Sequence, residues 1–211
     1  NQIQNLAGTV GVLEKLSQTD SELLKKYSKV YFLNENYNPE GLSSIDPIYL
    51  IQKEKTTQIN SKVLPYLYKM LADATEQGVD LKILSAYRSF KEQGSLKSTY
   101  TVTYGTGANK FSADQGYSEH QLGTTLDFTN TKNGAVINGF DKTAEYKWLQ
   151  DNAYKYGFVL SYPKENTYYV FEPWHWRYVG INLATRIHND NTYFYALDQR
   201  NIDSYLIDLF N

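Results

Sequence analysis

Three histidines occur in this chain of 211 residues, and the first two lie in segments that also carry carboxylates able to act with them. His120 is followed by Asp127 seven positions later, and Glu172 precedes His175 by three. Seven positions along one straight strand would place a His and an Asp on opposite faces, but Gly123 allows a turn that points both the same way. Two imidazoles and one carboxylate are the ligand set of a catalytic zinc, with one position left for water. We therefore expect His120, Asp127 and His175 to hold a metal.

Glu172 is close enough to His175 in sequence to act at the same centre. Pro173 lies between them and cannot donate to a β-ladder, so it marks a strand edge or a bulge that can turn both side chains toward one point. A metal lowers the pKa of a bound water toward about 7, and an adjacent carboxylate can accept that proton and later return it. Glu172 is therefore the candidate base. In the alternative interpretation, both histidines are ordinary buried residues and Asp127 pairs with an arginine.

A candidate anion site lies at the start of a helix. Arg88 ends the segment Ser-Ala-Tyr-Arg and comes just before Ser89, which forms a capping box with Glu92. Free N–H groups at a helix N-terminus and a guanidinium both favour an anion, and an arginine can hold a carboxylate through two parallel hydrogen bonds. Gln93, one turn into this helix, is expected to face the same cleft. The alternative is that Arg88 is a surface or salt-bridging arginine, and we interpret His188 as a surface residue.

The pattern of apolar residues indicates which elements must position these side chains. We expect helices over 60–77, 89–101, 143–156 and from 181 onward, and strands over 79–84, 125–129, 158–160 and 168–179. Residues 34–58 are expected to be irregular and 104–118 to form a loop. Because helices and strands do not alternate regularly, the predicted fold class is α+β, a single domain with a small, mostly antiparallel sheet flanked by helices. We divide the chain into an N-terminal helical lead-in, 1–34, and a catalytic domain, 35–211.

Composition excludes several classes of protein. Apolar residues make up 41% and charged residues 21%, which is typical of a globular protein. The net charge is −2 and no run of lysine and arginine is dense enough to bind a phosphate backbone, which disfavours nucleic acid as a partner. The absence of cysteine excludes thiolate catalysis, thiolate zinc sites and disulfides. No apolar run approaches the roughly 20 residues of a membrane span. Because the chain begins with Asn1, we expect any signal peptide or anchor to lie upstream.

Three motifs, in this order, resemble those of the D-alanyl-D-alanine carboxypeptidase family of bacterial cell-wall zinc peptidases, which includes VanY-type D,D-carboxypeptidases and related L,D-carboxypeptidases. The motifs are Ser-Ala-Tyr-Arg at 85–88 followed by Gln93, Ser-x-His-x-x-Gly-x-x-x-Asp at 118–127, and Glu-Pro-Trp-His-Trp-Arg-Tyr-Val-Gly at 172–180. The resemblance covers roughly residues 35–188. The tail after Gly180 does not follow the family closely.

The resemblance implies a role for each motif residue. It implies zinc on His120, Asp127 and His175 and a general base at Glu172. It also implies that Arg88 binds the terminal carboxylate of the substrate; the expected substrate-binding residues are Arg88, Gln93, Ser118, Tyr87 and Trp174.

The same resemblance implies a substrate and a location. The expected partner is a peptidoglycan stem peptide ending in D-alanine, with L,D-cleavage of a tetrapeptide slightly favoured over D,D-cleavage of a pentapeptide. The expected protein is a monomer outside the cytoplasm, at the bacterial cell wall or anchored to the membrane.

Other classes of protein share parts of this pattern. Non-haem iron oxygenases also use two histidines and a carboxylate, but their carboxylate lies very near the first histidine and they need no base such as Glu172. A peptidoglycan endopeptidase, or a wall-binding module without catalysis, could share the fold. A serine hydrolase is disfavoured because the chain has no Gly-x-Ser-x-Gly segment.

Overall fold

The computed structural model describes residues 33, 35–104, 116–166, 169–198, 202 and 205, and only the backbone of 97 and 99–104. Apart from Leu33, the expected lead-in over 1–34 lies outside these residues, as does most of the loop expected over 104–118. Among the described residues, none of the helices has the length and hydropathy needed to cross a membrane.

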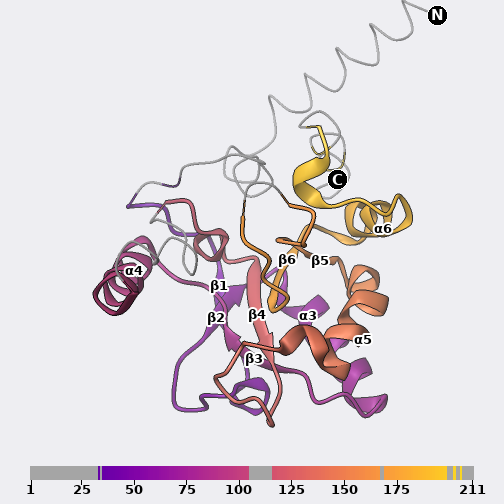
Figure 1. Cartoon of the computed structure of the whole chain (residues 1–211), viewed down its shortest axis with the longest axis horizontal. Coiled ribbons are helices and arrows are strands. Elements are labelled where there is room, and N and C mark those ends of the chain that lie inside the picture. Colours follow the sequence, from indigo (N-terminus) through magenta and orange to yellow (C-terminus); the bar gives the residue numbers. More distant parts are fainter. Residues whose placement is uncertain are drawn as a thin grey trace, which may run out of the picture.

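The described elements mix short strands with helices (Figure 1). The strands are β1 (Leu42–Ser44), β2 (Gln58–Asn60), β3 (Lys82–Ser85), β4 (Thr125–Thr129), β5 (Phe158–Leu160) and β6 (His175–Tyr178). The α-helices are α3 (Leu64–Glu76), α4 (Phe90–Tyr104), α5 (Ala144–Asn152) and α6 (Ile181–Asn189). Short 3-10 helices are η1 (Pro47–Tyr49), η3 (Glu119–Leu122), η4 (Phe140–Lys142), η5 (Ala153–Tyr156) and η6 (Phe194–Ala196).

Four of the strands form an antiparallel sheet in the order β3-β4-β6-β5, while β1 and β2 form a separate two-stranded antiparallel sheet. Within the larger sheet, Asp127 of β4 lies directly opposite His175 of β6. The predicted fold class, α+β with a small antiparallel sheet and flanking helices in one domain, is confirmed.

The two faces of the sheet have different neighbours. Leu126 and Phe128 of β4 are fully buried in the main core with residues of α3 and α5. In Figure 1, α3 and α5 lie together on one side of the strands and α4 lies apart from them on the other. Because side chains alternate along a strand, Asp127 projects from the face opposite Leu126 and Phe128. The strand predicted over 125–129 is confirmed.

Several predicted elements differ in extent from the structure, and two of these differences lie close to the site. The helix expected over 60–77 begins at Leu64, because the backbone of Gln58–Asn60 pairs with β1 instead. The strand expected over 168–179 is limited to His175–Tyr178. A turn precedes it, in which the His175 N–H donates to the Glu172 carbonyl at 3.1 Å, so the chain cannot run straight through Pro173.

Candidate metal centre and substrate cleft

The three predicted ligands come from two strands and one short helix. Asp127 and His175 are cross-strand neighbours on β4 and β6, so their side chains leave the same face of the sheet. His120 lies in η3, and Gly123 ends that helix with φ at +71°, a left-handed conformation that turns the chain into β4. The three side chains offer ligand atoms that all lie within 4.8 Å of one another. All three residues are buried.

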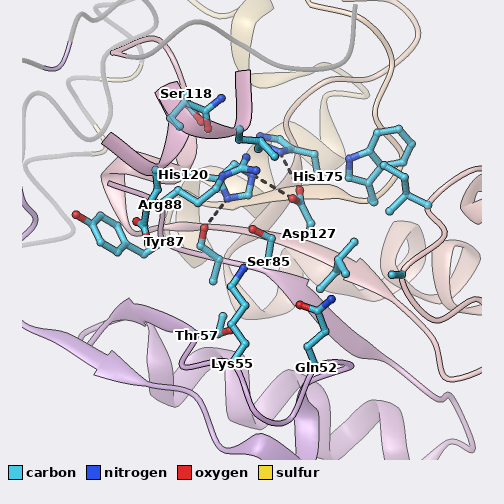
Figure 2. Close-up of a pocket in the computed structure, with 18 of the residues that line it drawn as sticks. Gln52, Lys55, Thr57, Ser85, Tyr87, Arg88, Ser118, His120, Asp127 and His175 are labelled. Atoms are coloured by element: carbon cyan, nitrogen blue, oxygen red, sulfur yellow. Dashed lines mark hydrogen bonds and ion pairs between the residues drawn. The ribbon is translucent and has the colours of Figure 1, made fainter. Parts of the chain in front are cut away.

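In each imidazole, the ring nitrogen that faces away from Asp127 donates a hydrogen bond that sets the orientation of the ring. Nδ1 of His120 donates to the Ala86 carbonyl at 2.6 Å, which turns Nε2 toward Asp127 at 3.2 Å. Nε2 of His175 donates to the Glu119 carboxylate at 2.9 Å, which turns Nδ1 toward Asp127, also at 3.2 Å. Metal-binding histidines are held in this way, with the second nitrogen donating to a carbonyl or carboxylate. Figure 2 shows the two rings and Asp127 converging on one place.

The electrostatics of the cluster fit a cation. Burial, assisted by the positive charge of Arg88, lowers the pKa of His120 to about 4, so this ring is neutral at pH 7. The one N–H of this neutral ring, at Nδ1, donates to the Ala86 carbonyl. Nε2 therefore carries a lone pair, which faces a carboxylate oxygen of Asp127. Burial alone would raise the pKa of Asp127, but the two histidines outweigh it and hold that pKa well below its ordinary range. Nε2 of His120 and the Asp127 carboxylate thus present lone pairs to each other, and a metal ion between them would accept both.

Glu172 lies beside the three ligand candidates. One of its carboxylate oxygens is 3.6 Å from Nδ1 of His175, and its own N–H donates to the Tyr162 carbonyl at 3.0 Å. Burial raises the pKa of Glu172 to about 7, against the opposing charge of His175. A carboxyl group with a pKa near the working pH can both accept and return a proton, which is the property required of a general base.

Arg88 comes three residues after the end of β3 and lines the same cavity as the predicted ligands. Its backbone N–H donates to the His120 carbonyl at 3.3 Å, and its side-chain Nε is buried without a hydrogen-bond partner in the described part of the chain. The predicted capping box follows: the Ser89 N–H donates to the Glu92 carboxylate at 2.8 Å and the Glu92 N–H donates to the Ser89 hydroxyl at 3.2 Å. A buried donor without a partner costs free energy, which a bound anion would recover.

One cavity of about 570 Å³ contains every residue that the sequence singled out for chemistry. Its lining includes the predicted ligands, Glu172 and the five expected substrate-binding residues, Tyr87, Arg88, Gln93, Ser118 and Trp174. Figure 2 shows Arg88, Tyr87 and Ser118 near His120, and Gln52, Lys55 and Thr57 along another wall. The Tyr87 hydroxyl donates to Asn38 at 2.8 Å, so the side chain is fixed in place. His188 is exposed and stacks on Tyr154, as expected for a surface residue.

Comparison with known proteins agrees with this geometry. The family model of VanY, described as D-alanyl-D-alanine carboxypeptidase, matches residues 56–181, which is more than half of the chain. The chain belongs to this family.

Individual relatives place the chain within the D-alanyl-D-alanine carboxypeptidase family. It is 36% identical over 180 residues to the putative carboxypeptidase YodJ of Bacillus subtilis. This alignment covers 82% of this chain and 66% of YodJ, just under two thirds of that relative's length. The solved structure of the LdcB LD-carboxypeptidase aligns with a TM-score of 0.72 at 35% identity, over 82% of this chain and 84% of LdcB. A mutant of the vancomycin-resistance D,D-pentapeptidase VanY, solved in complex with Zn(II), aligns with a TM-score of 0.63 at 27% identity. The alignment covers 81% of this chain and 99% of the VanY chain.

The sequence did not identify Glu119, which lies inside one of the family motifs. This carboxylate is fully buried and accepts hydrogen bonds from His175, Arg177 and two hydroxyl groups. The sequence did place an acid next to His120 and an arginine two positions after His175, both within the motif segments. Without the β4–β6 register, however, nothing indicated that these two charges meet.

Proposed function

We propose that this chain is a zinc-dependent carboxypeptidase that removes the C-terminal D-alanine from bacterial peptidoglycan stem peptides. The observation that carries the proposal is the single cavity in which a three-ligand cluster, a carboxyl group with a raised pKa and an arginine with a buried, unpartnered Nε lie together. Membership of the D-alanyl-D-alanine carboxypeptidase family and the Zn(II) in the VanY structure support the choice of reaction and metal.

Each residue has a defined part in the proposed reaction. Zinc held by His120, Asp127 and His175 would supply Lewis-acid activation of a water molecule and of the scissile carbonyl. Glu172 accepts the proton of the attacking water and returns it to the amine of the departing D-alanine. Arg88 holds the terminal carboxylate through paired hydrogen bonds, which selects a free C-terminus and places the last peptide bond at the centre.

Within this activity, we propose cleavage of a tetrapeptide at an L,D-bond as the first substrate. The support is the likeness to the LdcB LD-carboxypeptidase, at 35% identity and a TM-score of 0.72, which exceeds the likeness to the D,D-pentapeptidase VanY at 27% and 0.63. D,D-cleavage of a pentapeptide is the second candidate, favoured by the family model's own description. We further propose that residues 35–211 form the catalytic domain and that the protein acts, as a monomer, outside the cytoplasm, where its substrate lies.

The test is mass spectrometry of purified tetrapeptide and pentapeptide after incubation with the protein, with a chelator and then with added zinc. Loss of one alanine that the chelator prevents and zinc restores is the expected result, and the peptide that loses it identifies the substrate. Cleavage only within cross-linked peptides would indicate an endopeptidase. Binding of wall fragments without any cleavage by the zinc-loaded protein would indicate a non-catalytic wall-binding module, and an oxygen requirement with iron would indicate an oxygenase.

A further inference from the structure

Glu119 lies behind His175, on the side of the ring away from Asp127. Its oxygen Oε2 accepts the hydrogen bond from Nε2 of His175 at 2.9 Å. Its other oxygen, Oε1, accepts from Arg177 at 2.8 Å and from the Ser161 hydroxyl at 2.9 Å. The Glu119 carboxylate is therefore fixed from several directions, and its position determines that of the imidazole.

The C-terminal segment, residues 190–198, supplies a further contact to this carboxylate. The Tyr195 hydroxyl, from η6, donates to Oε1 of Glu119 at 2.7 Å. The neighbouring Phe194 ring packs against the Arg177 guanidinium, 4.5 Å from the ring centroid. Both aromatic residues are buried in a second hydrophobic cluster with Val179 of the same chain. The C-terminal segment is thus packed directly against the groups that hold Glu119.

This segment lies beyond the part of the chain that the family model matches, which ends at residue 181. It also carries no residue of the three motifs. A role in the metal site was therefore not expected of it. Nevertheless, only one side chain, that of Glu119, separates Tyr195 from a proposed metal ligand.

Physical considerations give these contacts a function. A fully buried carboxylate is stable only when it is paired and hydrogen-bonded, and here an arginine and three other donors provide that compensation. Residues that accept from the second nitrogen of a metal-binding histidine fix its tautomer and ring orientation. The ring of His175 is held on its flat side as well, by Tyr162 stacked at a centroid distance of 4.3 Å and an interplanar angle of 9°.

We infer that Glu119 and Tyr195 are positioning residues for the metal, so that the C-terminal segment completes the metal site from behind His175. This inference rests on the zinc site proposed above. Glu119 keeps the proton of His175 on Nε2 and leaves Nδ1 free to bind the metal. Tyr195 holds Glu119 in the position where it can do so.

The experiment measures zinc affinity, which does not depend on the substrate. The dissociation constant is obtained by competition with a chromogenic chelator for the wild-type chain, Tyr195→Phe and Glu119→Gln. We expect Glu119→Gln to weaken zinc binding about 10- to 100-fold and Tyr195→Phe about 10-fold, the range found for groups that orient metal ligands. The visible spectrum of the Co²⁺-loaded protein, which reports ligand geometry, should change in both variants.

The matched control is Tyr156→Phe. The Tyr156 hydroxyl also donates to a carboxylate, that of Asp73 at 2.5 Å, but neither residue lines the cavity that contains the proposed metal ligands. This variant should lose some stability and keep the zinc affinity and the Co²⁺ spectrum of the wild type. Because Glu119→Gln removes the carboxylate partner of buried Arg177 and could prevent folding, Tyr195→Phe is the primary variant.

The outcomes separate this inference from the proposal on which it rests. A wild-type chain that binds no zinc would refute the metal site itself. Tight zinc binding by the wild type, with the same affinity and spectrum in folded Tyr195→Phe, would overturn the role of Tyr195 and leave the metal site intact. An equal loss of affinity in Tyr156→Phe would show that the effect is only one of stability.

Discussion

Two glutamates contact the same imidazole, and their surroundings give them opposite properties. Burial would raise the pKa of Glu119, but Arg177 and the hydrogen bonds from His175 and Tyr195 hold it well below its ordinary value. Glu172 is also mostly enclosed, but the described residues give it no comparable set of donors, and burial raises its pKa to about 7. When the pKa values of two neighbouring acids differ in this way, one acid remains ionised and the other can exchange protons.

From this division we expect Glu172→Gln to bind zinc as the wild type does and to lose turnover. The amide keeps the size of the side chain but cannot accept a proton, so kcat should fall about 100- to 10,000-fold, the usual contribution of a general base. Zinc content by atomic absorption and kcat on the cleaved peptide are the measurements. The control is Glu165→Gln, an exposed acid in the same 162–172 connection. If Glu172→Gln retains full kcat, another group must be the base.

Arg88 leads to a prediction that concerns the substrate rather than the metal. Arg88→Ala removes a bidentate, charge-assisted contact, worth on the order of 3 kcal/mol, and should lower kcat/KM for a peptide with a free C-terminus about 100-fold. A peptide whose last residue is amidated offers no carboxylate, so the two proteins should use it equally poorly. Steady-state kinetics on both peptides tests this. An identical loss of kcat/KM on the free and the amidated peptide would mean that Arg88 does not bind the terminal carboxylate.

At the scale of elements, the site depends on the turn between η3 and β4. Gly123 occupies a left-handed conformation, and a Cβ there would approach Cγ of Pro39 to 3.0 Å and Cδ2 of Leu42 to 3.3 Å. The Gly123 carbonyl also accepts from the Asn60 N–H at 2.8 Å, which ties the turn to β2. Displacement of this turn would move His120 relative to Asp127.

We therefore expect Gly123→Ala to cost more than backbone strain alone. A left-handed alanine costs roughly 1–2 kcal/mol. Gly78 provides the matched control, since its φ is +74° and a Cβ there would meet nothing within 4 Å. Gly78→Ala should show only the strain and keep its zinc affinity, whereas Gly123→Ala should lose more stability and bind zinc more weakly. Denaturant unfolding and chelator competition measure both, and equal behaviour of the two variants would contradict the role of the turn.

Local sequence signals were sufficient for the elements that are determined locally. The Ser89 capping box, the strand over 125–129 and the end of the helical segment at residue 156 all appear where the sequence predicted them. These signals depend on neighbours within a few positions. They also predicted that a turn at Gly123 lets the side chains of His120 and Asp127 point the same way.

What the sequence could not provide was pairing between distant segments. The short strands β1 and β2 were not predicted, because they pair across some 16 positions and neither has a long alternating pattern. Glu119 and Tyr195 are 76 positions apart, and their contact depends on the path of the chain after α6. The predicted ligands could be named because their types and order matched a family, whereas the residues behind them could be found only from the fold.

At the scale of the whole molecule, the sheet separates a conventional core from a polar face. One face, with Leu126, Phe128 and Trp176, packs into the main hydrophobic cluster. The opposite face carries Asp127 and His175, together with the Glu119 network and the C-terminal segment. Folding therefore brings several charged groups into the interior at one place. The arrangement is most favourable when a cation compensates Asp127 and the histidine lone pairs.

This organisation predicts that zinc stabilises the whole fold and not only the cleft. A ligand that binds the native state alone raises the free energy of unfolding by about 2.7 kcal/mol when its free concentration is 100 times the dissociation constant, which for a chain of this size raises Tm by about 5–10 °C. Scanning calorimetry of the chelator-treated and zinc-loaded chain measures the shift. Asp127→Asn is the control, because it removes the charged ligand while keeping the side chain's size, and its Tm should respond little to zinc. If zinc bound stoichiometrically but left the Tm of the wild type unchanged, it would have to bind the folded and the unfolded chain equally well. The cluster at β4 and β6 would then not be its site.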